Sequence, residues 1–128
     1  MSNLKLGIVH KVEIVVEKKH LASSLGSGGI DVFATPMMIT LMEGASLDLV
    51  QPLLEDGQTT VGTLVDVKHI AATPLGMKVY AESELIEIDR KRLVFKVTAY
   101  DEREKIGEGI HERFIIDSQK FLEKTGQK

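Results

Sequence analysis

Apolar and polar residues alternate with a period of two over much of the second half of the chain, which is typical of strands with one buried face. The alternation predicts three such strands, whose buried faces are formed by Val61, Val65, Val67 and His69, by Met77, Val79 and Ala81, and by Leu93, Phe95, Val97 and Ala99. In the first of these strands, Gly62, Asp66 and Lys68 are expected on the opposite face. A fourth strand is expected over residues 106–116, and a further strand over residues 4–16.

Residues 37–50 break this alternation, because they are apolar around most of a helical circumference, as in a buried helix. We predict Thr35 as the N-cap and Pro36 as the first helical residue, with Pro52 and Gly57 ending the helix. The glycine-rich residues 23–29 before it are expected to form a flexible loop. A short helical segment is expected over residues 118–124.

The order is therefore a strand, a long loop, a buried helix and a meander of four strands. The short links between the later strands favour antiparallel neighbours. The expected fold class is α+β, a hot-dog fold in which a roughly five-stranded antiparallel sheet wraps one long central helix, with residues 1–128 forming a single domain. Such a sheet leaves an unpaired edge and an uncovered face, so we expect a homodimer.

Composition excludes several classes of function. The 128 residues include no Cys, which rules out disulfides, thiolate nucleophiles and cysteine-ligated metals. A net charge of −3 and few aromatic residues argue against nucleic-acid binding. No apolar stretch approaches the length of a membrane span, and the first residues do not resemble a signal peptide. A cytoplasmic protein without a membrane partner is expected.

Two titratable residues lie within apolar segments. Glu43 lies in a helix rich in Met and Leu, where it is either a nucleophile, base or water-orienting carboxylate or an exposed surface residue. His69 is expected on the buried face of its strand, where it either exchanges protons near neutral pH or is a hydrogen-bonded core histidine. Thr35 is explained by capping alone. It lies eight residues before Glu43, about 12 Å along a helix, so in a joint site either the loop geometry or a dimer interface would have to close that distance.

His111 and Arg113 share a face of the last strand with Gly107 and Gly109, which would leave open space beside them. They either bind an anionic or carbonyl oxygen or form a partly exposed polar face. No metal-binding spacing, phosphate-binding loop ending in Lys-Ser/Thr, or nucleophile elbow is present, so no metal site is expected.

Four segments together point to a known family. They are Val-Phe-Ala-Thr-Pro-Met-Met at 32–38, Leu-Met-Glu-Gly-Ala at 41–45, Thr-Val-Gly at 60–62 and Val-Lys-His-Ile-Ala-Ala-Thr-Pro-Leu-Gly at 67–76. In this order and spacing the chain resembles the fluoroacetyl-CoA thioesterase-like branch of the hot-dog-fold thioesterases. The resemblance covers nearly the whole chain.

The resemblance implies a homodimer that hydrolyses an acyl-CoA thioester without a metal or redox cofactor, CoA being part of the substrate. It implies catalytic positions at Thr35, Glu43 and His69, and substrate-binding positions at Phe33, Gly62 and Arg113. The aromatic gating residues of specialised fluoroacetyl-CoA hydrolases are not found in residues 25–30. A short- or medium-chain acyl-CoA thioesterase is therefore expected. The alternatives are a noncatalytic acyl-CoA or small-ligand binding protein with the same dimeric cleft and, less favoured, an enoyl-CoA hydratase.

Overall fold

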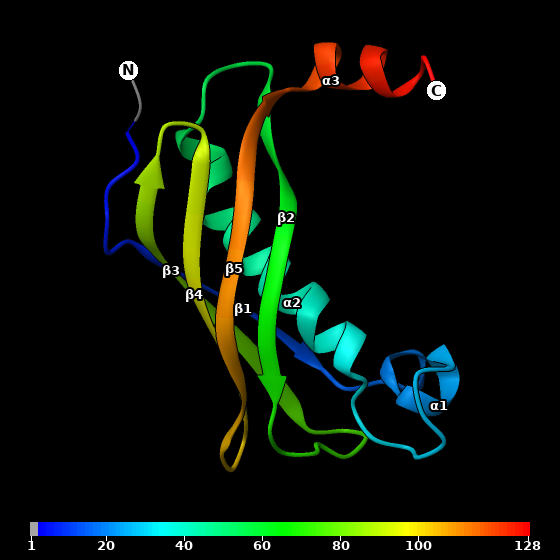
Figure 1. The fold of residues 1–128 in the computed structure, drawn as a ribbon. Helices are drawn as coiled ribbons and strands as arrows, with labels where there is room; N and C mark the ends of the chain where they lie inside the picture. Colours follow the sequence, from blue (N-terminus) through cyan, green and yellow to red (C-terminus); the bar gives the residue numbers. More distant parts are fainter. Residues whose placement is uncertain (1–2) are drawn as a thin grey trace.

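The computed structural model describes residues 3–128 and consists of a curved antiparallel sheet that wraps around one long helix (Figure 1). The strands are β1 (Val9–Val15), β2 (Gln58–His69), β3 (Lys78–Asp89), β4 (Arg92–Asp101) and β5 (Lys105–Asp117). The helices are α1 (Ala22–Leu25), α2 (Thr35–Val50) and α3 (Ser118–Thr125), with single 3₁₀ turns η1 (Lys18–His20) and η2 (Gln51–Leu53). This arrangement is the expected hot-dog fold.

The strand order in the sheet is β1-β3-β4-β5-β2, which differs from the predicted meander. Only β3, β4 and β5 follow one another through short hairpins. The connection at residues 70–77 is long enough to carry the chain across two strands, so β2 pairs with β5 and not with β3. As a result β2 forms one edge of the sheet and β1 the other.

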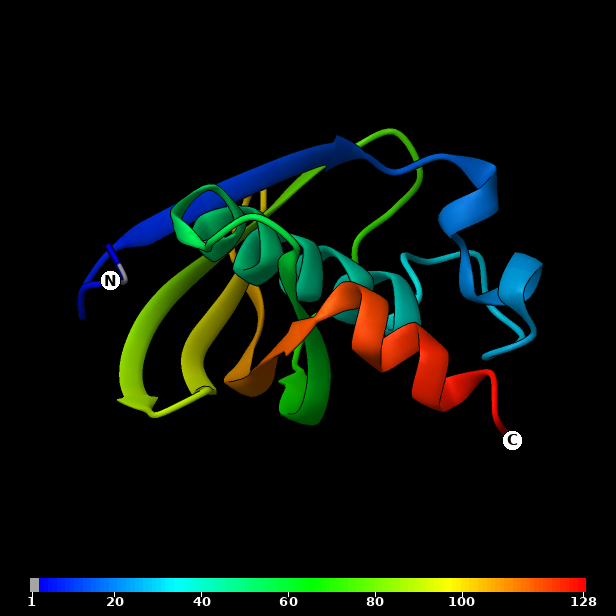
Figure 2. The same cartoon turned by 90° about the horizontal axis from the view of Figure 1, so that it is seen from above.

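Helix α2 lies against the concave face of the sheet, and its buried side forms the centre of the core (Figure 2). Met38, Met42 and Ala45 are nearly inaccessible to solvent. They face the inward residues of the strands, which include Ala81, Leu93, Phe95, Val97 and Ala99 as the alternation predicted. The predicted buried helix and the predicted inward faces of β3 and β4 are therefore confirmed.

Several element boundaries differ from the sequence-based expectation. The first strand begins at Val9, not Leu4, because Gly7 turns the chain with a φ of 89° just before it. The glycine-rich segment contains the short helix α1, which ends at Gly26 in the left-handed conformation. The C-terminal helix α3 is confirmed, and the Asp117 side chain caps it by accepting a hydrogen bond from the Lys120 N–H. None of the helices over residues 3–128 has the length and apolar character needed to cross a membrane.

A β-bulge between Gly62 and Leu64 shifts the register of β2 against β5. Before the bulge Gly62 pairs with Arg113, and after it Val65 pairs with His111, so both lie on the concave face that contacts α2. Val61 pairs with Phe114 and lies on the convex face. The prediction that Val61 shares a face with Val65 and that Gly62 opposes it was therefore wrong, since one extra residue inverts the alternation.

Candidate functional site

Thr35 and His69 contact each other directly. The Thr35 hydroxyl lies 2.7 Å from Nδ1 of His69, which ends β2 next to the start of α2. The predicted capping role of Thr35 was wrong: Ala34 is the N-cap, Thr35 is the first helical residue and Pro36 the second. The Thr35 hydroxyl is therefore not engaged in capping and is directed to the imidazole.

The imidazole of His69 has a second nitrogen without a partner. Among the described residues, Nε2 of His69 is a buried side-chain atom that makes no hydrogen bond. Burial lowers the pKa of His69, more than the nearby backbone of Ala71 raises it. A neutral imidazole near pH 7 is therefore favoured, with one nitrogen held by Thr35 and the other available to a bound molecule.

The Thr35–His69 pair lies on the wall of a cavity of about 300 Å³. The rest of the wall is apolar or small: Ala22, Ser27, Val32, Phe33, Ile70, Ala71 and Ala72. Phe33 is almost fully buried, so it belongs to the core and also limits the cavity. The cavity is suited to an uncharged, apolar group held beside the imidazole.

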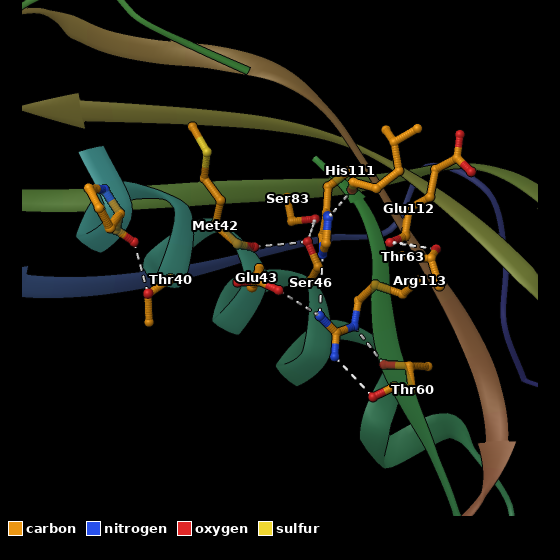
Figure 3. Close-up of polar contacts among 12 residues, drawn as sticks. Thr40, Met42, Glu43, Ser46, Thr60, Thr63, Ser83, His111, Glu112 and Arg113 are labelled. Carbon is orange, nitrogen blue, oxygen red and sulfur yellow. Dashed lines mark hydrogen bonds and ion pairs between the residues drawn. The ribbon is translucent and has the colours of Figure 1, made fainter. Parts of the chain in front are cut away.

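A second set of polar side chains, which we call the Glu43 cluster, comprises Glu43, Thr60, His111 and Arg113 around the backbone of Gly62 (Figure 3). The guanidinium of Arg113 lies 3.7 Å from the Glu43 carboxylate in an ion pair. A Cβ atom added at Gly62 would lie 2.8 Å from Oε2 of Glu43, closer than real side chains approach. A side chain at this position would therefore displace the carboxylate end of Glu43 from where it lies.

His111 and Arg113 are buried, not partly exposed, and the glycines beside them do not open a space. Met38 occupies the position next to Gly107, and the backbone of Asp66 and Val67 covers Gly109. Burial lowers the pKa of Arg113, and the negative charge of Glu43 opposes this shift. The expectation of an open polar face beside the last strand was wrong because the helix and β2 pack directly against these glycines.

Within one chain the structure does not bring all three predicted catalytic residues together. Thr35 is the first residue of α2, whereas Glu43 is two turns further along the same helix. At about 1.5 Å per residue, their backbones are roughly 12 Å apart along the axis. The Thr35–His69 pair and the Glu43 cluster are thus two separate groups on the concave face of one chain.

The start of α2 offers few free backbone donors. Pro36 has no N–H, and the N–H groups of Met37 and Met38 both donate to the carbonyl of Ala34. An oxyanion bound there would rely on side chains more than on the backbone amides at the start of the helix. No cluster of three or more potential metal ligands is found among residues 3–128.

Comparison with known proteins gives the family. The model of the fluoroacetyl-CoA-specific thioesterase family matches residues 16–119. The chain belongs to this family. This membership confirms the resemblance seen in the sequence and the expected enzyme class, a thioester hydrolase.

Individual relatives agree with this result. The fluoroacetyl-CoA thioesterase of Streptantibioticus cattleyicolor is 43% identical over 98 residues, which are 77% of this chain and 70% of that protein. A solved structure of a fluoroacetyl-CoA thioesterase superposes with a TM-score of 0.93 at 35% identity and covers 98% of both chains. A Thermus thermophilus protein described as a thioesterase superfamily member has a TM-score of 0.90 at 28% identity, over 99% of this chain and 94% of that one.

Proposed function

We propose that this protein hydrolyses a short- or medium-chain acyl-CoA thioester to the free acid and CoA, with Thr35, Glu43 and His69 as its catalytic residues. The observation that carries the proposal is the 2.7 Å contact between Thr35 and His69, on the wall of an open pocket lined mostly by small and apolar residues, with the second imidazole nitrogen unpartnered. Family membership supplies the reaction class. No metal or redox cofactor enters the proposed reaction.

The proposed enzyme is a homodimer that pairs the edge strands β2 of two chains. Residues 62–66 of β2 are exposed along this free edge, including the apolar side chains of Leu64 and Val65. In an antiparallel pair related by a twofold axis, residues on either side of the axis face each other. An axis near Val65 would bring His69 of one chain close to Gly62 of the other, which would unite the two groups of the site.

The proposed chemistry begins at the thioester carbonyl. The Glu43 carboxylate either attacks this carbon, releasing CoA thiolate and forming an anhydride that water then cleaves, or takes a proton from a water that attacks directly. The Thr35 hydroxyl positions the reacting group, and His69 transfers a proton to the departing sulfur or stabilises developing charge. Arg113 and Gly62 line the approach to Glu43.

The acyl group would occupy the cavity beside Thr35 and His69. Phe33 is its only aromatic wall residue, and residues 25–30 supply no aromatic side chain that could close over a two-carbon group. We therefore propose a general acyl specificity over a fluorine-selective one.

The test is thiol release from a panel of acyl-CoA esters, followed with a thiol-reactive dye, with oligomeric state measured in parallel. Glu43→Gln and His69→Ala should each lower the rate by at least about 100-fold, the scale expected of a general acid–base group. Glu13→Gln, an exposed carboxylate on β1, is the matched control and should retain wild-type activity. If the wild-type protein binds acyl-CoA but releases no thiol, the enzyme proposal fails and the alternative, a noncatalytic acyl-CoA binding protein, takes its place.

A further inference from the structure

The guanidinium of Arg113 is held on two of its sides by protein groups. Its Nε donates to the Thr60 hydroxyl at 2.7 Å, and its Nη2 donates to the Thr60 carbonyl at 2.9 Å. The remaining nitrogen, Nη1, lies 3.7 Å from the Glu43 carboxylate and 3.3 Å from Nε2 of His111. Only 6% of Arg113 is exposed, so its partners are set by the protein and not by solvent.

His111 has one protonation state that satisfies both of its contacts. A guanidinium can only donate, so Nε2 of His111 must be the unprotonated acceptor of Nη1. The proton of the neutral ring is then on Nδ1, which donates to the Leu64 carbonyl at 2.7 Å. Leu64 is the first residue after the bulge of β2, so the same irregularity that turns Gly62 toward Glu43 also supplies the acceptor for His111.

We propose that His111 is a positioning residue that keeps Arg113 from closing fully onto Glu43; the inference rests on the proposed function of Glu43. Because Thr60 binds Nε and Nη2, Nη1 is the nitrogen that faces the carboxylate, and without His111 it would close onto a Glu43 oxygen in a direct charge-assisted hydrogen bond. By accepting one hydrogen bond from Nη1, His111 holds the guanidinium 3.7 Å away, where it attracts the charge of Glu43 without blocking the carboxylate. His111 does not need to touch the substrate.

Two substitutions separate the two hydrogen bonds of His111. His111→Gln puts a carbonyl oxygen near the position of Nε2 and keeps the acceptor for Arg113, whereas His111→Asn puts an amide N–H near Nδ1 and keeps only the bond to Leu64. The Asn variant should lose about tenfold to 100-fold in kcat, and the Gln variant less than roughly threefold, since small displacements of catalytic groups have effects of this size. KM should change little in either variant.

Equal losses in the two variants, or a larger loss in His111→Gln, would overturn the proposal, because they would show that ring packing or the bond to Leu64 matters instead. If both variants unfold, ¹⁵N NMR of His111 in the wild-type protein decides. We expect a protonated Nδ1 and an unprotonated Nε2 whose shift changes in Arg113→Lys; a protonated Nε2 would overturn the proposal. A wild type that hydrolyses no acyl-CoA would refute the proposed function, whereas the NMR result would still test the contact.

Discussion

Thr35 and His69 are 34 positions apart in the sequence and are joined by a 2.7 Å hydrogen bond between the start of α2 and the end of β2. Because Ala34 occupies the N-cap, this hydroxyl is not required to begin the helix. Substitutions at Thr35 can therefore remove the contact with His69 without removing a helix cap, and their effect on activity tests the role of the contact.

Thr35→Val should lower kcat/KM by about fivefold to tenfold, which corresponds to the loss of one hydrogen bond with a net free energy of roughly 1 to 1.4 kcal/mol. Thr35→Ser keeps the hydroxyl and should stay near the wild-type rate. Thermal unfolding should give similar melting temperatures for both variants. A Val variant that is fully active would show that the contact with His69 has no part in turnover.

Gly62→Ala should impair activity more than stability. Its Cβ would lie 2.8 Å from Oε2 of Glu43, and this carboxylate end is flexible, with 40% of the Glu43 side chain exposed, so it can move aside. We expect a loss of at least about tenfold in kcat, because the carboxylate leaves its position. Steady-state kinetics with a denaturant titration measure both effects.

Gly44→Ala is the control for this substitution, since a Cβ there meets nothing within 4 Å and Gly44 directly follows Glu43 on α2. Replacing a helical glycine with alanine should raise stability by up to about 1 kcal/mol and leave activity unchanged. Similar losses of activity in the two alanine variants would argue against a specific steric effect at Gly62.

The buried histidines predict that stability falls with acid. Burial lowers the pKa of His111, with the Leu64 carbonyl opposing the shift, and burial also lowers the pKa of His69. Just below pH 6.5 the unfolded chain therefore binds more protons than the folded protein, so the free energy of unfolding decreases as the pH falls toward the lowered values. Urea titrations from pH 7.5 to 5 should show this slope. It should be shallower in His111→Phe, and an unchanged slope would contradict the assignment.

The side chain of Asp101 connects the loop after β2 with the hairpin between β4 and β5, at the same end of the sheet as His69. Burial opposes its ionisation, yet hydrogen bonds from the backbone of Arg103, the Thr73 hydroxyl and the backbone of Glu104 lower the pKa of Asp101 overall. This contribution to stability is present above the unfolded pKa near 3.8 and is lost as the pH falls through the lowered folded value.

Thr73→Val removes one of these hydrogen bonds at nearly constant volume. It should destabilise the protein by about 1 to 3 kcal/mol at pH 7, because a buried carboxylate oxygen loses a partner. At a second, acidic pH below 3.8, as the pH falls through the lowered folded value and the carboxyl is protonated, the difference between variant and wild type should shrink. Chemical denaturation at the two pH values measures this; a difference that grows with acid would exclude the proposed role of the carboxylate.

The sequence predicts the elements of this fold better than their connections. Alternation identifies inward residues of β3 and β4 such as Val79 and Phe95, because they lie in stretches before the register shifts of these strands, which fall between Leu85 and Glu87 and between Ala99 and Tyr100. It does not show that β2 pairs with β5, since strand order depends on a loop whose path no local pattern encodes. The bulge at Gly62 was missed for a similar reason, because an inserted residue is identified only by the register of its partner strand.

The candidate site was predicted by resemblance more than by pattern. Local reasoning assigned Thr35 to capping, because a threonine before a proline fits that role, and only the structure shows its hydroxyl directed at His69. The burial of His111 and Arg113 was also missed, since flanking glycines suggest open space in a sequence but are filled by Met38 and the β2 backbone in the fold.

The bulge in β2 divides this strand into two segments of opposite phase. Before the bulge the even-numbered residues of β2 lie on the concave face, and after it the odd-numbered residues do. A relative lacking the extra residue between Gly62 and Leu64 would therefore present a different set of side chains to Glu43, even if every other residue were identical. A gap of one residue at this point of an alignment therefore changes the site more than most substitutions. The length of the strand, and not only its composition, is part of what specifies the site.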